Sequence, residues 1–283
     1  MHKMFKILFS RQWWKTTVLV LAAVAVMIRL GIWQLDRLEQ RRVFNTRVEA
    51  QLAEPPLDLS GQNLIKDLYG MEYRTARVSG EYDHARQVVL RNQDWQGRLG
   101  VLILTPLLIE GEDSAILVER GWIPYEDYTE GNLNQFDELG LVEVEGLIRR
   151  SQSKSAIGGR ADQVPGPGEA PLEIWNWINV TDISQQIPYQ LLPVYISASP
   201  NSSPQELPYR SQQELELTEG SHLGYAFQWF IFAAILAIGY PLFVRREENR
   251  AAADNDNQKN PYIRSEKNSD PSSEPESKGY DQA

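Results

Sequence analysis

The chain has 283 residues, a formal net charge of −10 at pH 7 and no cysteine. The lack of cysteine excludes disulfides, thiolate metal sites and CxxxC copper chemistry. Residues 45–221 carry 13 Lys and Arg against 27 Asp and Glu, a net charge of −14. Nucleic acids bind basic surfaces, so this acidic region argues against a nucleic-acid partner.

Two apolar segments are long enough to cross a lipid bilayer. Thr16 to Leu35 contains one charge, Arg29, and Leu223 to Val244 contains none. A helix of about 20 residues spans a hydrocarbon core of roughly 30 Å. We therefore predict transmembrane helices at residues 16–35 and 222–244, both embedded in the lipid bilayer.

The flanking charges predict how these helices are oriented. Basic residues precede the first helix and follow the second, and acidic residues precede the second: Lys3, Lys6, Arg11, Lys15, Arg245 and Arg246, against Glu214, Glu216 and Glu219. Basic residues favour the cytoplasmic side of a membrane. Residues 1–15 are therefore expected to be a cytoplasmic N-terminus, with both termini inside and the central region outside. No small-x-small cleavage site follows the first helix, which favours an uncleaved anchor.

The central region is predicted to be rich in β-strands. A helical stalk at residues 36–56 ends at Pro55 and Pro56, where the helix formers stop. Seven short runs of apolar and β-branched residues, separated by Gly, Asn and Asp, then read as strands: 73–82, 86–92, 101–110, 114–123, 141–149, 175–180 and 191–197. We predict a mainly β extracytoplasmic domain at residues 57–221, an antiparallel sheet that could close into a barrel.

The remaining segments have weaker patterns. Residues 151–171, rich in Gly and Pro, are expected to form a long mobile loop, and residues 181–187 a short helix capped by Thr181 or Asp182. Residues 245–283 have few bulky apolar residues and many polar ones, so we predict a disordered cytoplasmic tail.

The central domain has no recognisable catalytic motif. GxSxG, HExxH and P-loop patterns are absent, and His84 lies in an expected hairpin turn where a surface role is the usual one. Glu119 and Arg120 are interpreted as a structural salt bridge beside a turn. Four loop acids are expected to be solvated: Glu126, Asp127, Asp137 and Glu138. We predict that the protein is not an enzyme and has no catalytic residues.

The membrane helices carry the candidate binding residues. Arg29, Trp33 and Arg37 follow an i, i+4, i+8 spacing, so they form one stripe on the first helix. His222, Tyr225 and Trp229 follow an i, i+3, i+7 spacing on the second. Because the two helices run in opposite directions, both groups are expected at the outer surface of the membrane.

Two interpretations of these groups remain open. Trp and Tyr are common at membrane interfaces and Arg extends to lipid head groups, which would explain the aromatics without a ligand. Ionisable residues at membrane depth, however, are costly and tend to be functional. A haem could use an imidazole ligand, arginines at its propionates and aromatic faces against the macrocycle. On this hypothesis the cofactor-binding residues are His222, Arg29, Trp33, Arg37, Tyr225 and Trp229, with His222 binding the haem iron.

Several motifs resemble those of the surfeit locus protein 1 family, membrane assembly factors for haem–copper cytochrome c oxidase. The segment "LGIWQLDRLEQR" is close to the family pattern LGxWQLxRxxxK, with Arg41 in place of Lys. Further matches follow in the family's order over about residues 17–248: "EYRTARVSGEYD", "VLILTPL", "LVERGWIP", "VEGLIR" and "SHLGYAFQWF" followed by "RRE".

The resemblance implies a chaperone in respiratory chain biogenesis, which helps to insert or retain haem a in oxidase subunit I. It places the usual candidate haem ligand at His222. The family's Trp, Gln and Arg at the exit of the first helix fall on Trp33, Gln34 and Arg37. Its RGW-P turn falls on Arg120, Gly121, Trp122 and Pro124. Arg29 departs from the pattern and is either a further propionate partner or a residue that extends to the head groups.

The leading hypothesis is therefore a membrane-anchored assembly factor that binds haem a and contacts subunit I and other oxidase assembly factors. The second is a structural scaffold that binds oxidase subunits without haem, and the third is a haem-handling enzyme. Fewer than 16 residues precede the first helix, too few for a typical mitochondrial presequence, which favours a bacterial plasma membrane. Gly31 would let the two helices approach closely.

Overall fold

The structure, a computed structural model, describes residues 2–152, 162–166, 168–200, 206–210 and 215–259. The chain divides into two compact units, which we describe separately. Residues 1–42 and 219–283 form the helical unit, and residues 43–218 form the β unit.

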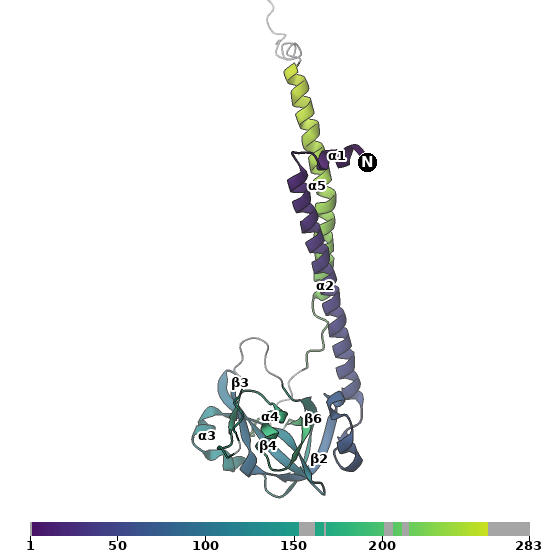
Figure 1. The fold of residues 1–283 in the computed structure, drawn as a ribbon. Coiled ribbons are helices and arrows are strands. Elements are labelled where there is room, and N and C mark those ends of the chain that lie inside the picture. The colour runs from purple at the N-terminus through teal and green to yellow at the C-terminus, as the bar shows by residue number, and fades with distance from the viewer. Residues whose placement is uncertain (1, 153–161, 167, 201–205, 211–214, 260–283) are drawn as a thin grey trace, which may run out of the picture. The chain divides into compact units, whose positions relative to one another are not determined.

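The helical unit contains three helices, α1 (His2–Leu8), α2 (Trp14–Ala53, of which residues up to 42 lie in this unit) and α5 (His222–Lys259). Within this unit α2 and α5 run side by side (Figure 1). The buried positions of α2 in this unit are spaced by multiples of seven, at Thr17, Gly31 and Leu38. On α5, Ala226 and Ala233 are seven residues apart, and Val244 is a further buried position. A seven-residue spacing is typical of helices that pack together along one seam.

Polar and aromatic contacts join the two helices near the start of α2. The Trp13 Nε1 donates a hydrogen bond to Glu248 Oε1 at 2.9 Å, and the Trp13 ring meets Phe243 edge-on at 6.1 Å. The Thr17 hydroxyl donates to Leu8 O at 2.7 Å and lies 2.7 Å from the Tyr240 hydroxyl. These contacts fix the register of α5 against α2.

Both helices contain stretches that could cross a membrane by length and composition. In the most apolar stretch of each helix, only 6% of α2 and 11% of α5 is buried within the protein. A core helix of a soluble protein would be mostly buried, so the exposed apolar surface is consistent with membrane anchoring. The predicted pair of flanking apolar helices is confirmed.

The ends of the helical unit differ from prediction. Residues 2–8 form α1, which we did not predict, and α5 continues to Lys259 where disorder was expected from residue 245. Residues 245–259 contain Arg, Glu and Ala and no Gly or Pro, which explains the continued helix. Arg250 and Glu247 add an ion pair at 3.1 Å one turn apart. Residues 260–283 of the predicted tail lie outside the described residues.

The described residues of the β unit form eight strands in one sheet: β1 (Leu57–Asp58), β2 (Thr75–Tyr82), β3 (Val88–Trp95), β4 (Arg98–Ile109), β5 (Ser114–Pro124), β6 (Leu141–Arg150), β7 (Ile174–Trp175) and β8 (Gln190–Ala198). The strand order is β1-β2-β6-β8-β5-β4-β3-β7, and β2 also pairs with β4. This extra pairing closes β2, β6, β8, β5 and β4 into a five-stranded barrel. The prediction of a mainly antiparallel, barrel-like domain is therefore confirmed.

The barrel has the connectivity of an OB-fold. Its first three strands in the chain, β2, β4 and β5, are neighbours in order, and the last strand, β8, lies between β5 and β6. The β5–β8 pair is parallel, and α3 (Tyr125–Thr129) lies between β5 and β6 in the chain. OB-folds are five-stranded Greek-key barrels of this kind, whose outer face and loops often bind ligands.

Apolar side chains fill the barrel and cover part of its outside. The interior includes Val78, Leu107, Ile116, Val118, Ile148, Val194 and Ile196, all of them buried. Outside, Trp175, Ile178 and α4 (Val180–Ser184) cover Leu117 and Tyr195. Side chains in a strand alternate between faces, so neighbours of the interior residues point outward. Glu119, Arg149 and Ser197 are such outward neighbours.

Two local predictions for the β unit need correction, the strand at 175–180 and the cap of the short helix. The expected strand at 175–180 ends at Trp175, because Asn179 caps α4 by accepting a hydrogen bond from Asp182 N at 3.3 Å. Asn179, rather than Thr181 or Asp182, is therefore the cap. Strand β1 was not predicted. The expected mobile loop includes residues 153–161 and 167, which lie outside the described residues.

The last turns of α2 belong to the β unit. Asn45 Nδ2 donates to Leu217 O at 2.7 Å, Phe44 meets Tyr73 edge-on at 5.9 Å, and Val48 is fully buried. The helix ends at Ala53, just before Pro55 and Pro56. The predicted stalk is therefore helical, and its end packs into the β unit.

Candidate functional site

His222, the first residue of α5, is held by the opposite helix. Its Nδ1 lies 2.9 Å from Gln34 Oε1. An amide oxygen can only accept a hydrogen bond, so Nδ1 is the donor, and in the neutral imidazole Nε2 then carries the lone pair. Nε2 makes no hydrogen bond with any residue that the structure describes. The imidazole is therefore oriented through one nitrogen, and the other nitrogen is available to a ligand.

Gln34 faces α5 because it lies on the helix seam. It is spaced three residues from Gly31 and four from Leu38, both of which are buried. Gly31 brings the helices close here, because a Cβ built on it would lie 2.6 Å from Cε1 of Phe230. From the sequence, Gln34 was identified only as one position of the family motif, not as a partner of His222. The signal that could have identified it is a polar residue on a seam of small and apolar positions.

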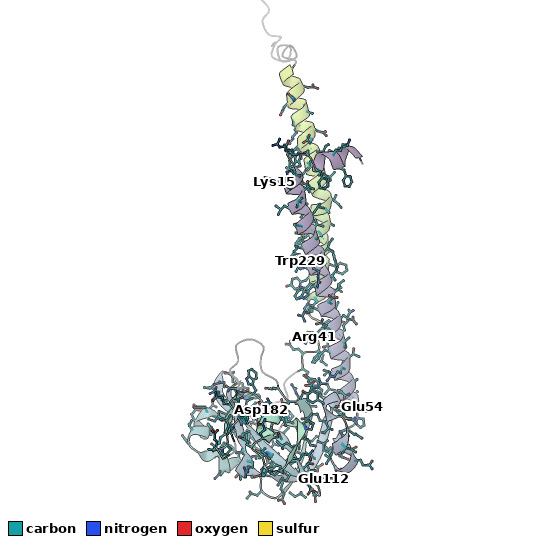
Figure 2. All side chains as sticks on the ribbon, viewed as in Figure 1. Lys15, Arg41, Glu54, Glu112, Asp182 and Trp229 are labelled. Atoms are coloured by element: carbon teal, nitrogen blue, oxygen red, sulfur yellow. The ribbon has the colours of Figure 1, made fainter. Side chains whose placement is uncertain are left out.

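The predicted aromatic residues flank this seam. The side chains of Trp33 and Tyr225 are 41% and 50% exposed, so much of each ring surface is free for a membrane or a ligand. Trp229, labelled in Figure 2, is half-buried and meets Phe232 edge-on at 6.3 Å.

The predicted arginines do not contact His222. The Arg37 guanidinium stacks on Trp33, 5.6 Å from the ring centroid, and donates to Gln40 Oε1 at 2.9 Å. Arg29 is exposed and lies about 160° around the helix axis from Gly31, at about 100° per residue. Its backbone position therefore faces away from the seam. The structure thus brings His222 to Gln34 and Arg37 to Trp33, whereas Arg29 stands apart.

An ion pair joins α2 to the segment just before α5. It lies just beyond His222 and Gln34, the residues that define what we call the helix-mouth site. Arg42 Nε and Nη2 donate to the two carboxylate oxygens of Glu219 at 2.8 and 3.0 Å. These hydrogen bonds lower the pKa of the Glu219 carboxyl. Both side chains are exposed, so the pair adds little stability and serves mainly to orient the chain that enters α5.

In the β unit, Arg120 is completely buried, and its partner is not Glu119. Its guanidinium donates to Gln87 Oε1 at 3.2 Å, to Glu138 Oε1 at 3.0 Å and to Phe136 O. Adjacent strand residues point to opposite faces, which separates Glu119 from Arg120. The interpretation of these two residues as a salt bridge is therefore wrong, and Arg120 is instead a structural cation.

Two of the four loop acids, Asp137 and Glu138, are less solvated than predicted, whereas Glu126 is exposed as predicted. Glu138 also accepts a hydrogen bond from Arg210 Nη2 at 2.7 Å. Asp137 Oδ1 lies 3.1 Å from His84 Nδ1, and both side chains are largely buried. His84 Nε2 lies 3.0 Å from Glu138 O. These contacts give His84 a structural explanation and place it outside the helix-mouth site.

The RGW-P motif, expected as a turn, lies at the end of strand β5 and fixes the segment that leads towards α5. Gly121 has a φ of +133°, and a Cβ there would lie 2.8 Å from Tyr209 O. Trp122 exchanges two backbone hydrogen bonds with Tyr209, at 2.9 and 2.8 Å. Its indole stacks on Tyr209 at 5.8 Å and donates to Gln93 O at 3.1 Å. Within the β unit these motif residues are therefore structural.

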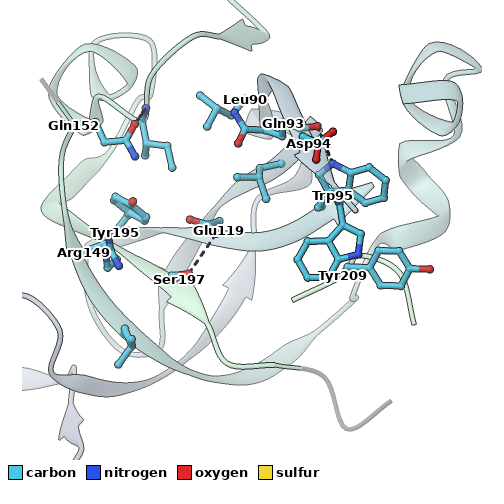
Figure 3. A pocket seen from close by; sticks show the side chains of 14 residues that line it. Leu90, Gln93, Asp94, Trp95, Glu119, Arg149, Gln152, Tyr195, Ser197 and Tyr209 are labelled. Atoms are coloured by element: carbon cyan, nitrogen blue, oxygen red, sulfur yellow. Dashed lines mark hydrogen bonds between the residues drawn. The ribbon is translucent and has the colours of Figure 1, made fainter. Parts of the chain in front are cut away.

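A pocket of about 200 Å³ opens on the outer face of the barrel (Figure 3). Its lining comes from β3, β4, β5, β6 and β8 together with Gln152, Ile178 and Tyr209. Glu119 accepts a hydrogen bond from Ser197 Oγ at 3.3 Å, and burial raises the pKa of the Glu119 carboxyl. Sequence reasoning missed this pocket. The available signal was one acid within an apolar strand, "AILVERGWI".

Comparisons with known proteins agree with this architecture. The model of the SURF1 family matches residues 21–234, a range that runs from α2 to α5 and includes the barrel. A SURF1-like protein of Rickettsia conorii is 27% identical over 236 residues, covering 82% of this chain and 92% of the relative.

Similar proteins occur in eukaryotes. A SURF1-like protein of Monosiga brevicollis is 26% identical, covering 82% of this chain and 88% of its own. Surfeit locus protein 1 of Rattus norvegicus is 24% identical, covering 78% of this chain and 74% of its own. The family model accounts for well over half of the chain. The chain therefore belongs to the SURF1 family, which is generally known as a family of oxidase assembly factors.

Proposed function

We propose that this protein is a non-enzymatic, membrane-anchored assembly factor that holds haem a for subunit I of haem–copper cytochrome c oxidase. The observation that carries the proposal is the His222–Gln34 hydrogen bond, which orients His222 and leaves its Nε2 with a lone pair. Ligand histidines are commonly oriented in this way, with the second nitrogen donating to an oxygen acceptor.

The residues at the helix mouth fit a haem. A bound haem would supply an iron that the imidazole of a single histidine could ligate. His222 would bind through Nε2, and Gln34 would keep the proton on Nδ1. The exposed faces of Trp33 and Tyr225 would pack against the macrocycle together with Trp229.

The arginines would contribute unequally. Arg37 lies on the Trp33 ring and carries a guanidinium that could bind a propionate. Arg29 faces away from the seam, so we expect it to extend to lipid head groups instead. Substitution of Arg37 should therefore weaken haem retention more than substitution of Arg29.

The absorption spectrum of the purified protein tests the proposal. The full chain is expressed in cells that make haem a, purified in detergent and compared with the H222A variant. We expect a Soret band in the wild type that is lost or shifted in H222A and restored by added imidazole. His84→Ala is the matched control, because it removes an imidazole from the β unit, and it should leave the band unchanged.

The opposite result is equally clear. If folded wild-type protein and H222A carry no haem, the protein is a scaffold that binds oxidase subunits without haem. If H84A removes the band and H222A does not, the haem site lies in the β unit and the proposal is wrong.

We further propose that the helices anchor the protein in a bacterial plasma membrane with both termini in the cytoplasm. Arg11 and Lys15 before the apolar part of α2, with Arg245 and Arg246 after the apolar part of α5, support this orientation. The chain has no cysteine, so single cysteines report topology directly. A membrane-impermeant maleimide applied to spheroplasts should label Glu143→Cys and not Gln12→Cys. The reverse pattern would invert the topology.

A further inference from the structure

The pocket on the barrel is separate from the helix-mouth site and is not explained by haem binding. It is lined by β-unit residues only. At about 200 Å³ it is smaller than the roughly 300–1,000 Å³ typical of pockets for drug-sized ligands. A haem or a nucleotide is therefore too large, and a single amino-acid side chain is a suitable size.

The polar floor of the pocket contains an acid with an incomplete set of partners. Glu119 is largely buried on β5 and accepts only a long hydrogen bond from Ser197 among the described residues. Arg149, on β6, lines the same pocket but forms no ion pair with Glu119 within 4 Å in the part of the chain that the structure describes. Its guanidinium instead stacks on Tyr73 at 4.8 Å. In the view of Figure 3, Glu119 lies between Arg149 and Tyr195 on one side and Trp95 and Tyr209 on the other.

One side of the pocket is an aromatic wall. Tyr209 stacks between Trp95 and Trp122, with ring centroids 5.9 and 5.8 Å apart and interplanar angles of 20° and 13°. The wall already attracts a cation, because the Arg98 guanidinium lies 6.0 Å from the Trp122 ring centroid. Aromatic faces favour Lys, Arg and other organic cations. An acid beside such a wall is a suitable site for a cation.

Negative charge predominates around the pocket, because among the described residues Glu119 and Asp94 line it together with a single cation, Arg149. Residues 45–221 also carry a net charge of −14. Such a field attracts basic partners and raises their association rate. We propose that this pocket binds a Lys or Arg side chain of a partner protein, with Glu119 as the ion-pair acceptor and the Trp95–Tyr209–Trp122 stack as the aromatic wall.

Capped amino acids test this proposal without knowledge of the partner. The probe is N-acetyl-arginine amide, and N-acetyl-citrulline amide is its neutral isostere. Both are titrated by calorimetry into the detergent-purified full chain without haem. We expect the arginine derivative to bind in the millimolar range and the citrulline derivative to bind at least about tenfold more weakly, the effect of losing one charged hydrogen bond.

Two variants locate the binding. Glu119→Gln should weaken arginine binding about tenfold, whereas Glu143→Gln, which removes the same charge from an exposed position on β6, should change it less than about twofold. Trp95→Leu, which shortens the aromatic wall without touching Glu119, should also weaken binding. Circular dichroism confirms that each variant is folded.

Several results would overturn the proposal. These are no arginine binding by the folded wild type, equal binding of arginine and citrulline, or unchanged binding in E119Q. Binding of N-acetylglycine through Arg149, in place of the arginine derivative, would show that the pocket recognises a carboxylate. None of these measurements depends on haem, so the two proposals fail independently.

Discussion

Gly31 gives the sharpest test of how α2 and α5 meet. In a Gly31→Ala variant the new Cβ would lie 2.6 Å from Cε1 and 2.7 Å from Cζ of Phe230. Carbon atoms in contact prefer about 3.5–4.0 Å, so the Phe230 ring must move by about 1 Å. Overpacking of this kind costs about 1–3 kcal/mol.

Helix propensity acts in the opposite direction. Alanine is favoured over glycine inside a helix by about 1 kcal/mol, so the net cost of G31A is about 0–2 kcal/mol. Phe230→Ala removes the ring. In that background G31A no longer meets a ring and should stabilise the protein by about 1 kcal/mol, from propensity alone. The effect of one substitution thus changes sign with the second, as a double-mutant cycle measures.

Thermal unfolding of the four proteins in detergent measures this cycle. A second readout is crosslinking between cysteines at Arg42 and Glu219, whose native side chains form an ion pair at 2.8 Å. A short bismaleimide should join them in the wild-type background and less efficiently in Gly31→Leu. If G31A has the same effect with and without Phe230, the ring contact is not what limits position 31, and the reasoning is refuted.

Three further predictions follow from the described contacts. Burial raises the pKa of the Glu119 carboxyl above its ordinary value of 4.5, so the folded state binds more protons than the unfolded state in this range. The stability of the wild type should therefore fall relative to that of Glu119→Gln as the pH rises from about 4.5 through the raised pKa. A difference in melting temperature between the two proteins that does not change with pH would contradict this. Arg120→Met should cost about 3 kcal/mol or more by denaturant unfolding, because it breaks a buried charge network, whereas exposed Arg98→Met should cost far less. Gln34→Leu should lower haem retention less than H222A, since it removes only the orientation of His222; a loss as complete as that in H222A would mean that Gln34 itself contacts the haem.

The predictable parts of the fold are those set by local pattern. An apolar run of about 20 residues forms a helix with little help from the rest of the chain, so α2 and α5 were predicted. The alternating runs of β2 to β6 and of β8 were likewise predicted from residues within each strand. The parallel pairing of β5 with β8 was not, because it depends on residues more than 70 positions apart in the chain.

The candidate site shows the same division. Spacing placed His222 and the exit of α2 at one end of the helix pair, and the hydrogen bond to Gln34 agrees with this placement. The stripe of Arg29, Trp33 and Arg37 suggested arginine partners for His222. The seam instead follows Gly31, Gln34 and Leu38, because buried positions repeat every seven residues along α2. The stripe of Arg29, Trp33 and Arg37 therefore does not lie on the seam.

The pocket of the β unit was beyond sequence reasoning for a geometric reason. Glu119, Ser197 and Arg149 lie on three neighbouring strands, and Tyr209 joins the wall only through its backbone pairing with Trp122. No segment of the chain contains more than a fragment of this arrangement. Its acid is also costly, since burial disfavours the charged form, and the hydrogen bond from Ser197 and the charge of Arg149 offset this only in part.

Two of the motifs that carried the family resemblance therefore have different roles. In "LGIWQLDR", Gly31 and Gln34 join α2 to α5 and orient a histidine, whereas Trp33 and Arg37 remain at the surface for a ligand or a membrane. In "LVERGWIP", Arg120 and Trp122 hold the barrel and the segment before α5, whereas Glu119 accepts only a long hydrogen bond from Ser197 among the described residues. Each motif is thus linked to a polar group that remains available for binding. For the first motif this group is Nε2 of His222, which Gln34 orients, and for the second it is the carboxylate of Glu119.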